Sequence, residues 1–299
     1  MTAGAPLPRI LVLTFTPIDR EPRALKQIRY FMDRAEVTTA GFGPAPVDGV
    51  PHIQLDPSPP ARGMMRVPGR YGALLALRAY RLFDGVKPRN VSARARLVGG
   101  DWDVVIAHDV ATLAVAREIA PRAGILVDLH EYAPRQGEAS RLWQMLIAPY
   151  FRWICRTQVT QAAGVTTVGQ GIVDEYRRRF GFDSTLVVNA TPFQPLAPGP
   201  VGTPIRLVHS GIPAAPRKLE VMIDAVKATT TPVTLDLYLI KDGSEYYPSL
   251  VERGGDVPRI TIEDGPPMLR SENARLSGWV YVDVRGRDLR SAVHDMQAA

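Results

Sequence analysis

The segment Arg9-Ile-Leu-Val-Leu-Thr-Phe15 decides the fold of the first half of the chain. It is a short run of aliphatic and β-branched residues without polar alternation, which is typical of a strand buried on both faces of a parallel sheet. Apolar residues at helical spacing follow it, behind Asp19 as an expected N-cap and Pro22 in the first turn. These apolar residues are Leu25, Ile28, Phe31 and Met32. The chain therefore opens with a strand, a loop and a helix.

The same alternation continues to residue 189. Further buried strands are expected at 36–41, 103–107, 124–128, 164–168 and 185–189. Helices are expected at 71–83, 110–119, 141–161 and 171–180. The Pro- and Gly-rich stretch at 44–69 is expected to form a loop that contains one short strand. Alternating strands and helices predict an α/β fold with an open, doubly wound, mostly parallel sheet. Ligands of such sheets bind beyond the carboxyl ends of the strands.

A second unit follows a Pro-rich segment. Residues 191–204 hold five Pro and two Gly in 14 residues, which predicts a linker between domains. The pattern then restarts with a strand at 205–209, a helix at 219–228 and a strand at 235–240. Two strands and one helix are too few for a complete doubly wound sheet, so we expect this unit to be incomplete.

Composition excludes several classes of protein. The chain has 299 residues, is 45% hydrophobic and has one cysteine, so an intrachain disulfide and a disulfide-stapled secreted scaffold are excluded. No stretch approaches the roughly 18 uninterrupted apolar residues of a membrane span, and residues 1–9 lack the apolar core of a signal peptide. We therefore expect a soluble cytoplasmic protein.

The net charge of +6 comes mainly from arginine, since only five of the 36 basic residues are lysine. One interpretation of the arginine excess is codon bias. The alternative is a surface that binds phosphate groups, anionic lipid or an acidic substrate. The helix expected at 71–83 is basic and amphipathic, between Arg70 and the arginines that follow up to Arg96. Such a helix covers the core of an α/β domain, and it can also lie on the anionic inner face of the cytoplasmic membrane.

Polar residues follow two of the expected strands. Ala107-His108-Asp109 ends one strand and Asp128-Leu-His130-Glu131-Tyr132 ends the next, so two histidines and three acids should meet at one sheet edge. Each histidine alone is equally consistent with a structural role. No cysteine or third histidine stands at the spacing of a zinc site, and we predict no metal here.

The loop Ser210-Gly211-Ile-Pro-Ala-Ala-Pro-Arg217-Lys218 joins a strand to a helix and ends in two cations. Backbone N–H groups, the helix dipole and two cations suit a diphosphate. The alternative is that Arg217 and Lys218 are solvated residues of a first helical turn.

Together these motifs resemble those of retaining glycosyltransferases with two facing Rossmann-like domains, the GT-B architecture, in the glycosyltransferase 4/1 group. The resemblance spans residues 9–242. It rests on Asp19-Arg-Glu-Pro-Arg-Ala-Leu25, Ala107-His-Asp109, Val127-Asp-Leu-His-Glu-Tyr132, Val165-Thr-Thr-Val-Gly-Gln-Gly-Ile172, Val187-Val-Asn-Ala190, and Gly211 with Arg217. It implies a nucleotide-diphosphate sugar as co-substrate, a glycan or lipid acceptor in surface polysaccharide biosynthesis, no metal cofactor and no nucleic acid partner.

The resemblance also implies roles for individual residues. His130 would contact the donor sugar, with Glu131 beside it as a second catalytic residue, and Gly211, Arg217 and Lys218 would hold the donor diphosphate. The acceptor side of the cleft would be lined by Asp19, Arg23, His108, Asp109 and Asn189. The implied domains are an acceptor-side Rossmann-like domain at 1–190, a linker at 191–204 and a truncated donor-side unit at 205–245.

The chain departs from this family in three places. Thr16-Pro-Ile-Asp19 stands where many relatives have a Gly-Gly pair, and no two Glu with seven residues between them follow residue 205. The tail, assigned to 246–299, differs most from this family. Its residues 257–299 resemble a periplasmic segment of heavy-metal efflux pumps of the resistance-nodulation-division class. This resemblance includes the motif Gly278-Trp-Val-Tyr-Val-Asp-Val284. We therefore expect a chimeric chain with a strand at 279–284, a helix at 288–298 and impaired transferase activity.

Two other functions remain open from the sequence. Asp109 and Glu131 could form the carboxyl pair of a glycoside hydrolase. A chain that has lost its donor half could also be a non-catalytic nucleotide- or glycan-binding module.

Overall fold

The computed structural model describes residues 6–57, 68–138, 140–190, 193, 195, 197, 199–241 and 243–265, together with the backbone of 270–272 and 275–277. The chain divides into two compact units, Met1–Ala190 and Thr191–Ala299. Each unit is described by itself.

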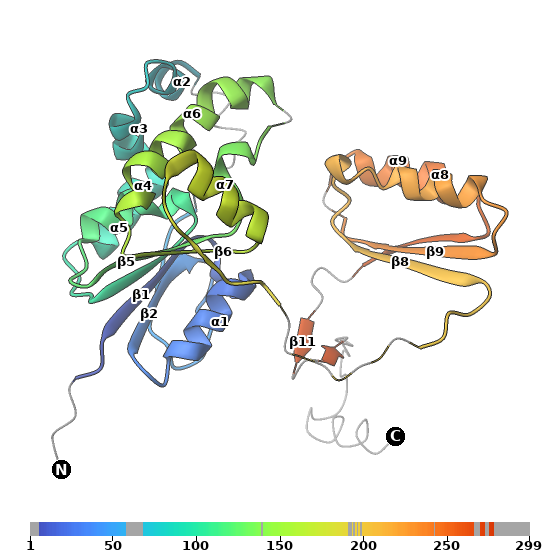
Figure 1. Cartoon of the computed structure of the whole chain (residues 1–299), viewed down its shortest axis with the longest axis horizontal. Helices are drawn as coiled ribbons and strands as arrows, with labels where there is room; N and C mark the ends of the chain where they lie inside the picture. Colours follow the sequence, from blue (N-terminus) through green and yellow to red (C-terminus); the bar gives the residue numbers. More distant parts are fainter. Residues whose placement is uncertain are drawn as a thin grey trace, which may run out of the picture. The chain divides into compact units, whose positions relative to one another are not determined.

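Unit 1 is built on a seven-stranded parallel sheet in the order β3-β2-β1-β4-β5-β6-β7 (Figure 1). The strands are β1 (Arg9–Pro17), β2 (Glu36–Phe42), β3 (His52–Gln54), β4 (Val104–His108), β5 (Gly124–Leu129), β6 (Gly164–Thr167) and β7 (Thr185–Leu186). The chain first adds strands on one side of β1 and then returns to add β4 on its other side. This reversal creates a topological switch point between β1 and β4, where doubly wound sheets bind ligands.

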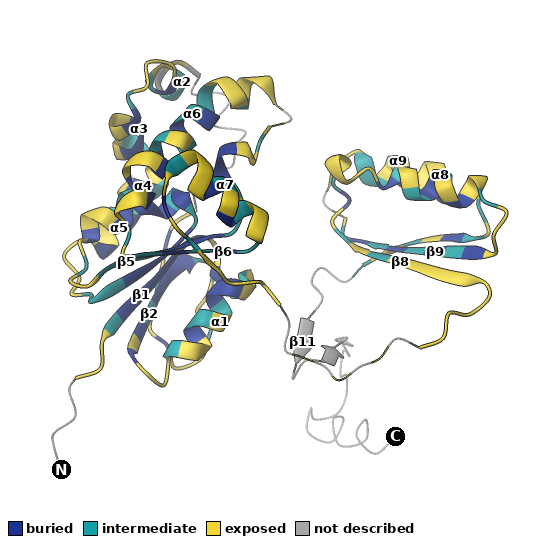
Figure 2. Cartoon of the chain, viewed as in Figure 1, coloured by how far each residue is buried: buried dark blue, intermediate teal, exposed yellow. Residues whose placement is uncertain are grey.

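Helices cover both faces of this sheet (Figure 1). They are α1 (Pro22–Phe31), α2 (Pro68–Ala76), α3 (Tyr80–Val86), α4 (Pro88–Leu97), α5 (Leu113–Ile119), α6 (Arg141–Thr157) and α7 (Gln170–Phe180). Ile10, Val12 and Ile106 point to the face that α1 covers, while Leu11, Leu13 and Ala107 point to the core under the other helices. The central strands are therefore buried on both faces, as the sequence predicts (Figure 2).

The basic segment is not one helix, and that prediction is wrong. It forms α2 and α3, which are separated by Arg78 in a left-handed conformation with φ of 55°. Helix periodicity does not reveal the break, because Arg78 is not a residue that usually marks a left-handed turn. The expected N-cap is also wrong: Asp19 lies in a short 3₁₀ helix, Ile18–Arg20, and Glu21 is the N-cap of α1.

Unit 2 contains a three-stranded parallel sheet in the order β10-β9-β8 (Figure 1). Its strands are β8 (Ile205–Gly211), β9 (Val233–Leu239) and β10 (Ile260–Asp264), and helices α8 (Glu220–Ala228) and α9 (Tyr246–Gly254) cover one face. Leu235, Leu237 and Ile223 belong to its core. In the sheet of the described residues β8 is an edge strand, and Figure 2 shows it largely exposed.

The sequence accounts for two strands and one helix of this unit, and the structure adds α9 and β10. Ile260 and Ile262 alternate with Thr261 and Glu263, and Ile260 joins the core under the helices. The sheet therefore continues beyond residue 245. A short antiparallel pair follows, β11 (Arg270–Glu272) with β12 (Arg275–Ser277). The strand expected at 279–284 and the helix expected at 288–298 lie outside the described residues.

None of the described helices is both long enough and apolar enough to cross a bilayer.

Candidate functional site

The polar cluster predicted from the sequence lies at the carboxyl edge of the unit 1 sheet, beside the switch point. β4 ends at His108 and β5 at Leu129, and the two strands pair with His108 opposite Asp128. Side chains alternate along a strand, so His108 and Asp128 share the α1 face with Ile106. Residues of α1 can therefore reach them.

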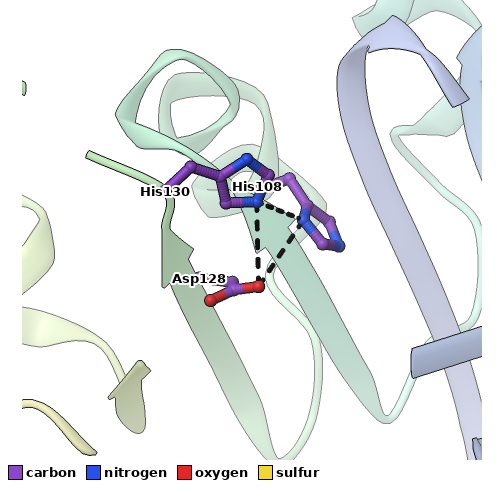
Figure 3. A group of neighbouring side chains, drawn as sticks. All are labelled: His108, Asp128 and His130. Atoms are coloured by element: carbon purple, nitrogen blue, oxygen red, sulfur yellow. Dashed lines mark hydrogen bonds and ion pairs between the residues drawn. The ribbon is translucent and has the colours of Figure 1, made fainter. Parts of the chain in front are cut away.

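Three side chains form the centre of the site (Figure 3). Nδ1 of His108 lies 2.9 Å from Nε2 of His130. Oδ2 of Asp128 lies 3.8 Å from Nδ1 of His108 and 3.7 Å from Nε2 of His130. Burial and hydrogen bonding thus hold the His130 ring against a buried carboxylate.

Asp128 is completely buried and has a full set of hydrogen-bond donors. Its Oδ1 accepts hydrogen bonds from Arg23 Nη2 and, at 2.6 Å, from Thr166 Oγ1. Its Oδ2 accepts them from Arg23 Nε and Gln27 Nε2, both at 2.9 Å. Burial alone would raise the pKa of Asp128, but the hydrogen bonds from Arg23 and Thr166 lower it below its ordinary value. Asp128 is therefore an anion paired with the buried Arg23 guanidinium.

His108 is neutral in this setting. Burial lowers its pKa to about 3, with the Arg23 and His130 charges acting in the same direction and Asp128 opposing them. Its Nε2 is buried and has no hydrogen-bond partner among the described residues. A neutral His108 that donates its Nδ1 proton to Nε2 of His130 leaves Nδ1 of His130 as the donor on the opposite side of that ring.

Two further carboxyl groups face that opposite side of His130. Nδ1 of His130 lies 3.6 Å from Oδ2 of Asp109 and 3.7 Å from Oε1 of Glu21. The backbone N–H of His130 also donates to Oδ1 of Asp109 at 3.0 Å. Burial raises the pKa of both Asp109 and Glu21, although His130 opposes the rise. Two acidic side chains therefore lie within ion-pair distance of Nδ1 of His130.

His108, Asp128 and His130 have the residue types of a metal site, and their ligand atoms lie within 4.8 Å of one another. Their bonding does not fit a cation. A carboxylate offers about four lone pairs, and Arg23, Gln27 and Thr166 together occupy them all. The Arg23 charge next to the carboxylate would also repel a metal ion. These contacts leave no free lone pair on Asp128 for a metal ion, and the absence of a metal cofactor stays a prediction.

The structure brings together four of the predicted site residues, namely Arg23, His108, Asp109 and His130. Asn189 follows β7 and contacts α1 at Lys26, since its Oδ1 accepts a hydrogen bond from Nζ of Lys26 at 2.8 Å. Asp19 is outside this cluster and lies 3.8 Å from Nε of Arg20. Glu131 is exposed, and its carboxylate has no hydrogen-bond or ion-pair partner in the part of the chain that the structure describes.

Three residues of the cluster were not predicted from the sequence: Glu21, Gln27 and Thr166. Asp128 was expected among the acids of this sheet edge but was given no role. Asp128 stands in the motif around His130, two residues earlier, and this spacing places both on one face of the strand. Arg23 and Gln27 are four residues apart on α1 and so share a helix face. Thr166 lies in the motif Val165-Thr-Thr-Val-Gly-Gln-Gly-Ile172, but nothing in the sequence indicates its contact with Asp128.

In unit 2, the loop after β8 has the predicted composition and a compact geometry. Gly211 has φ of 152°, and a Cβ atom at this position would lie 3.1 Å from Nη1 of Arg217. The Arg217 guanidinium is therefore folded against the Gly211 backbone. Lys218 follows in a left-handed conformation with φ of 50° and is exposed. The structure thus brings Gly211 and Arg217 together at the carboxyl end of β8.

His209 is a residue of this loop region that sequence reasoning missed. Its Nε2 is buried, has no partner among the described residues, and would lie 3.9 Å from a Cβ at Gly211. An imidazole and a guanidinium beside a glycine backbone at one strand end form a group suited to an anion.

No family model matches this chain. A short segment is similar to curated efflux proteins: it is 53% identical over 45 residues to the putative cation efflux system protein SilA of Salmonella typhimurium and 52% identical over 44 residues to CusA of Escherichia coli K12. Each match covers 15% of this chain and 4% of the relative. Its length corresponds to the resemblance noted for residues 257–299.

Solved structures match far more of the chain. HepE of Anabaena, crystallised in complex with UDP-glucose, aligns with a TM-score of 0.53 and 14% identity over 87% of this chain and 69% of its own. Sucrose-phosphate synthase of Thermosynechococcus elongatus aligns with a TM-score of 0.56 and 13% identity over 87% of this chain and 71% of its own. Both are GT-B glycosyltransferases, and at these identities the likeness concerns the fold alone. The predicted fold class, Rossmann-like α/β of the GT-B type, is confirmed.

Proposed function

We propose that this chain is a retaining, nucleotide-sugar-dependent glycosyltransferase that transfers a sugar to a glycan or lipid acceptor. The observation that carries the proposal is the His130 site, which lies beside the topological switch point of the sheet in a chain with the GT-B fold. The fold it shares with HepE, whose structure contains UDP-glucose, supports a nucleotide sugar as donor.

In this proposal unit 2 binds the donor diphosphate. Arg217 lies against the Gly211 backbone, Lys218 is exposed beside it, and the two cations offset the charge that develops on the departing diphosphate. Electrostatic stabilisation of this kind requires no metal ion. Such a leaving group can itself accept the proton of the attacking hydroxyl, so the chain need not supply a strong base there.

Unit 1 supplies His130 for the donor sugar in this proposal. The Asp128–Arg23 pair holds the ring, and Nδ1 faces Asp109 and Glu21. A fixed imidazole between acidic groups can donate a hydrogen bond to a sugar hydroxyl with little reorganisation. Glu131 is exposed at the same edge and can contact a substrate that binds there.

We also propose that turnover is slow. The parallel sheet in the described part of unit 2 has three strands with helices on one face, and the sequence lacks the Glu pair that grips the donor in related enzymes. Loss of one charge-assisted contact costs roughly 1.5 to 3 kcal/mol, which is about ten- to a hundredfold in rate. The similarity to efflux proteins supports a chimeric origin of the tail. We expect turnover below the usual range of about 1 to 1000 per second.

Purified full-length chain tests the function. UDP and UDP-glucose binding is measured by calorimetry, and sugar transfer is measured with a panel of glycan and lipid acceptors. We expect Arg217→Ala to weaken UDP binding and His130→Ala to reduce transfer, each about tenfold or more. Matched controls are Arg206→Ala, an exposed arginine paired with Asp236, and His52→Ala, a histidine bonded to Thr39. Equal effects of the variants and their controls would contradict the site assignment.

A nucleotide- or glycan-binding module is the second candidate, because the small unit 2 sheet favours binding over turnover. Nucleotide-sugar binding that Arg217→Ala abolishes, with no transfer to any acceptor, would identify the chain as such a module. A glycoside hydrolase with Asp109 and Glu131 as its carboxyl pair is disfavoured. The pKa of Asp109 is raised, but Glu131 is exposed and has no partner among the described residues. Sugar release from a glycoside without any nucleotide would reverse that conclusion.

A further inference from the structure

A second charged cluster lies on the opposite face of the unit 1 sheet, where α3 meets α4. Asp84 and Tyr150 are buried, and Lys87 is nearly so. Nζ of Lys87 donates to Oδ1 of Asp84 at 2.9 Å, and the Tyr150 hydroxyl donates to the same oxygen. The ammonium also lies 4.3 Å from the ring centre of Phe83 and 4.1 Å from that of Tyr150. These contacts pair one cation with one carboxylate.

Arg89 adds a second cation, which has no direct ion-pair partner among the described residues. Its guanidinium lies 5.2 Å from the ring centre of Phe15, and it is partly buried. Within the described ranges it has no hydrogen-bond acceptor and no ion-pair partner. The neighbouring sequence 57–70, before α2 reaches Tyr71, contains three arginines and no acidic residue. That stretch supplies no carboxylate for Arg89.

The described residues therefore do not balance the charge of this cluster. Lys87 and Arg89 are cations, and Asp84 is the carboxylate that both of them face. Burial raises the pKa of Tyr150 well above its ordinary value, so its hydroxyl stays neutral. Burial also lowers the pKa of Lys87, to about 8, and that of Arg89. A partly buried guanidinium without a partner is costly, and an anion from solution removes that cost.

The cluster lies at the carboxyl edge of the sheet, and Arg89 is its partly exposed member. Phe15 is near the carboxyl end of β1, beyond Leu13, which pairs with Ala107 of β4. α4 leads into β4, so the residues that begin α4 lie at the carboxyl edge of the sheet. Arg89 and His130 are therefore at the same sheet edge, with Arg89 over the face that α3 and α4 cover. Doubly wound sheets bind their ligands at this edge.

We propose that Arg89 binds an oxyanion, a phosphate or a carboxylate, carried by the acceptor substrate. A guanidinium that lies over an aromatic ring keeps its edge free for a bidentate contact with either group. The identity of the ligand as the acceptor rests on the proposed glycosyltransferase function, whereas the anion site itself does not.

Anion binding is tested first, without any transfer reaction. Full-length protein in a buffer free of other oxyanions is titrated with inorganic phosphate and, separately, with acetate, with calorimetry as the readout. The background carries Arg217→Gln, so that the loop after β8 does not contribute. We expect Arg89→Gln to weaken binding of the preferred anion at least tenfold and Arg89→Lys to retain part of it. The control is Arg117→Gln, an exposed arginine on α5 that donates to Gln161.

Each outcome has a defined meaning. Stronger binding of phosphate than of acetate identifies a phosphorylated ligand, and the reverse order identifies a carboxylated one. Unchanged affinity in Arg89→Gln, or an equal loss in Arg117→Gln, would overturn the proposal. Circular dichroism and thermal unfolding of each variant separate loss of a contact from loss of the fold, and Arg89→Lys preserves the charge if Arg89→Gln is unstable.

The link to the acceptor is tested in a second step. If the chain transfers sugar, Arg89→Gln should raise KM at least tenfold for an anionic acceptor and leave KM for an uncharged acceptor and for the donor unchanged. Equal effects on both acceptors would show that the anion at Arg89 is not part of the acceptor. Anion binding at Arg89 without any transfer would leave the site intact and contradict the glycosyltransferase function instead.

Discussion

Asp128 is the residue on which the candidate site of unit 1 depends. It accepts hydrogen bonds from Arg23 and Gln27 on α1 and from Thr166 on β6, and it lies beside the rings of His108 and His130. One carboxylate thus joins a helix, two neighbouring strands and the proposed catalytic histidine. Because both charges of the Asp128–Arg23 pair are buried, each depends on the other.

We predict that Asp128→Asn destabilises the chain strongly. The substitution keeps the size of the side chain but leaves the Arg23 cation buried without its carboxylate, which costs about 3 to 5 kcal/mol. Urea unfolding measures the change. Asp183→Asn is the matched control, because Asp183 pairs with Arg177 at 2.6 Å on the exposed surface. That variant should lose less than about 1 kcal/mol. A similar loss in both variants would show that burial of the pair is not important.

His108 predicts a pH dependence of stability. Its folded pKa of about 3 lies below the ordinary value of 6.5, so between these values the unfolded chain binds a proton that the folded chain does not. Stability from this group is therefore lost as the pH falls from 6.5 toward 3, with a slope of at most about 1.4 kcal/mol per pH unit. Glu21 and Asp109 have raised pKa values and act in the opposite direction.

The share of His108 is isolated by comparison with His108→Gln. Denaturant unfolding of the wild-type chain and of this variant is measured across that pH range, and the difference between their stabilities should shrink as the pH falls. A difference that is independent of pH would mean that His108 titrates normally.

At the scale of elements, the basic segment between residues 68 and 86 differs most from its sequence-based expectation. It forms two short helices around Arg78 and leaves Leu77 and Leu82 78% and 64% exposed. Arg78 and Arg81 are neighbours of these leucines in the sequence. Apolar side chains among cations are typical of segments that lie on an anionic membrane surface.

We predict that α2 and α3 bind anionic lipid vesicles weakly. Each basic residue near such a surface contributes about 1 kcal/mol before screening by salt. Co-sedimentation with phosphatidylglycerol vesicles should exceed that with phosphatidylcholine vesicles and decrease steeply with ionic strength. Arg81→Glu should reduce it, and Arg117→Glu on α5 should not. Binding that ignores lipid charge and salt would favour the alternative, in which these helices only cover the core.

The whole molecule consists of two units with separate cores. Unit 1 has a core on each face of its sheet, and the core of unit 2 lies under α8 and α9. The last residues of unit 1 are attached to α1, since Arg23 donates to the Val187 carbonyl at 2.7 Å and Lys26 donates to the Ala190 carbonyl. The natural end of this unit is therefore close to residue 190.

We predict that a fragment of residues 1–190 folds by itself. It retains both cores and the contacts of α1 with residues 187–190, so its thermal unfolding should be cooperative. A fragment of residues 1–184 is the matched comparison, because it lacks β7 and the carbonyls that Arg23 and Lys26 bind. It should unfold at a lower temperature. An unfolded 1–190 fragment would show that unit 1 depends on the rest of the chain.

The sequence alone determined the class of the fold and the edge at which the site lies. Buried strands and amphipathic helices are local patterns of side chains, and polar residues directly after a strand must lie at its carboxyl end. The motifs around His108 and His130 could therefore be located without coordinates, and so could the loop from Gly211 to Arg217.

Which side chains meet depends on how distant segments of the chain pack together. Arg23 and Asp128 are 105 residues apart, and their contact depends on the face of β5 that α1 covers. The break at Arg78, the strand β10 and the lack of a partner for Arg89 among the described residues were likewise not visible in the sequence. These features depend on the register and packing of segments that are distant in the sequence. A short hydrophobic pattern does not specify them, because it is compatible with several registers. The physical reason is that hydrophobic periodicity specifies which face of an element is buried but not which partner buries it.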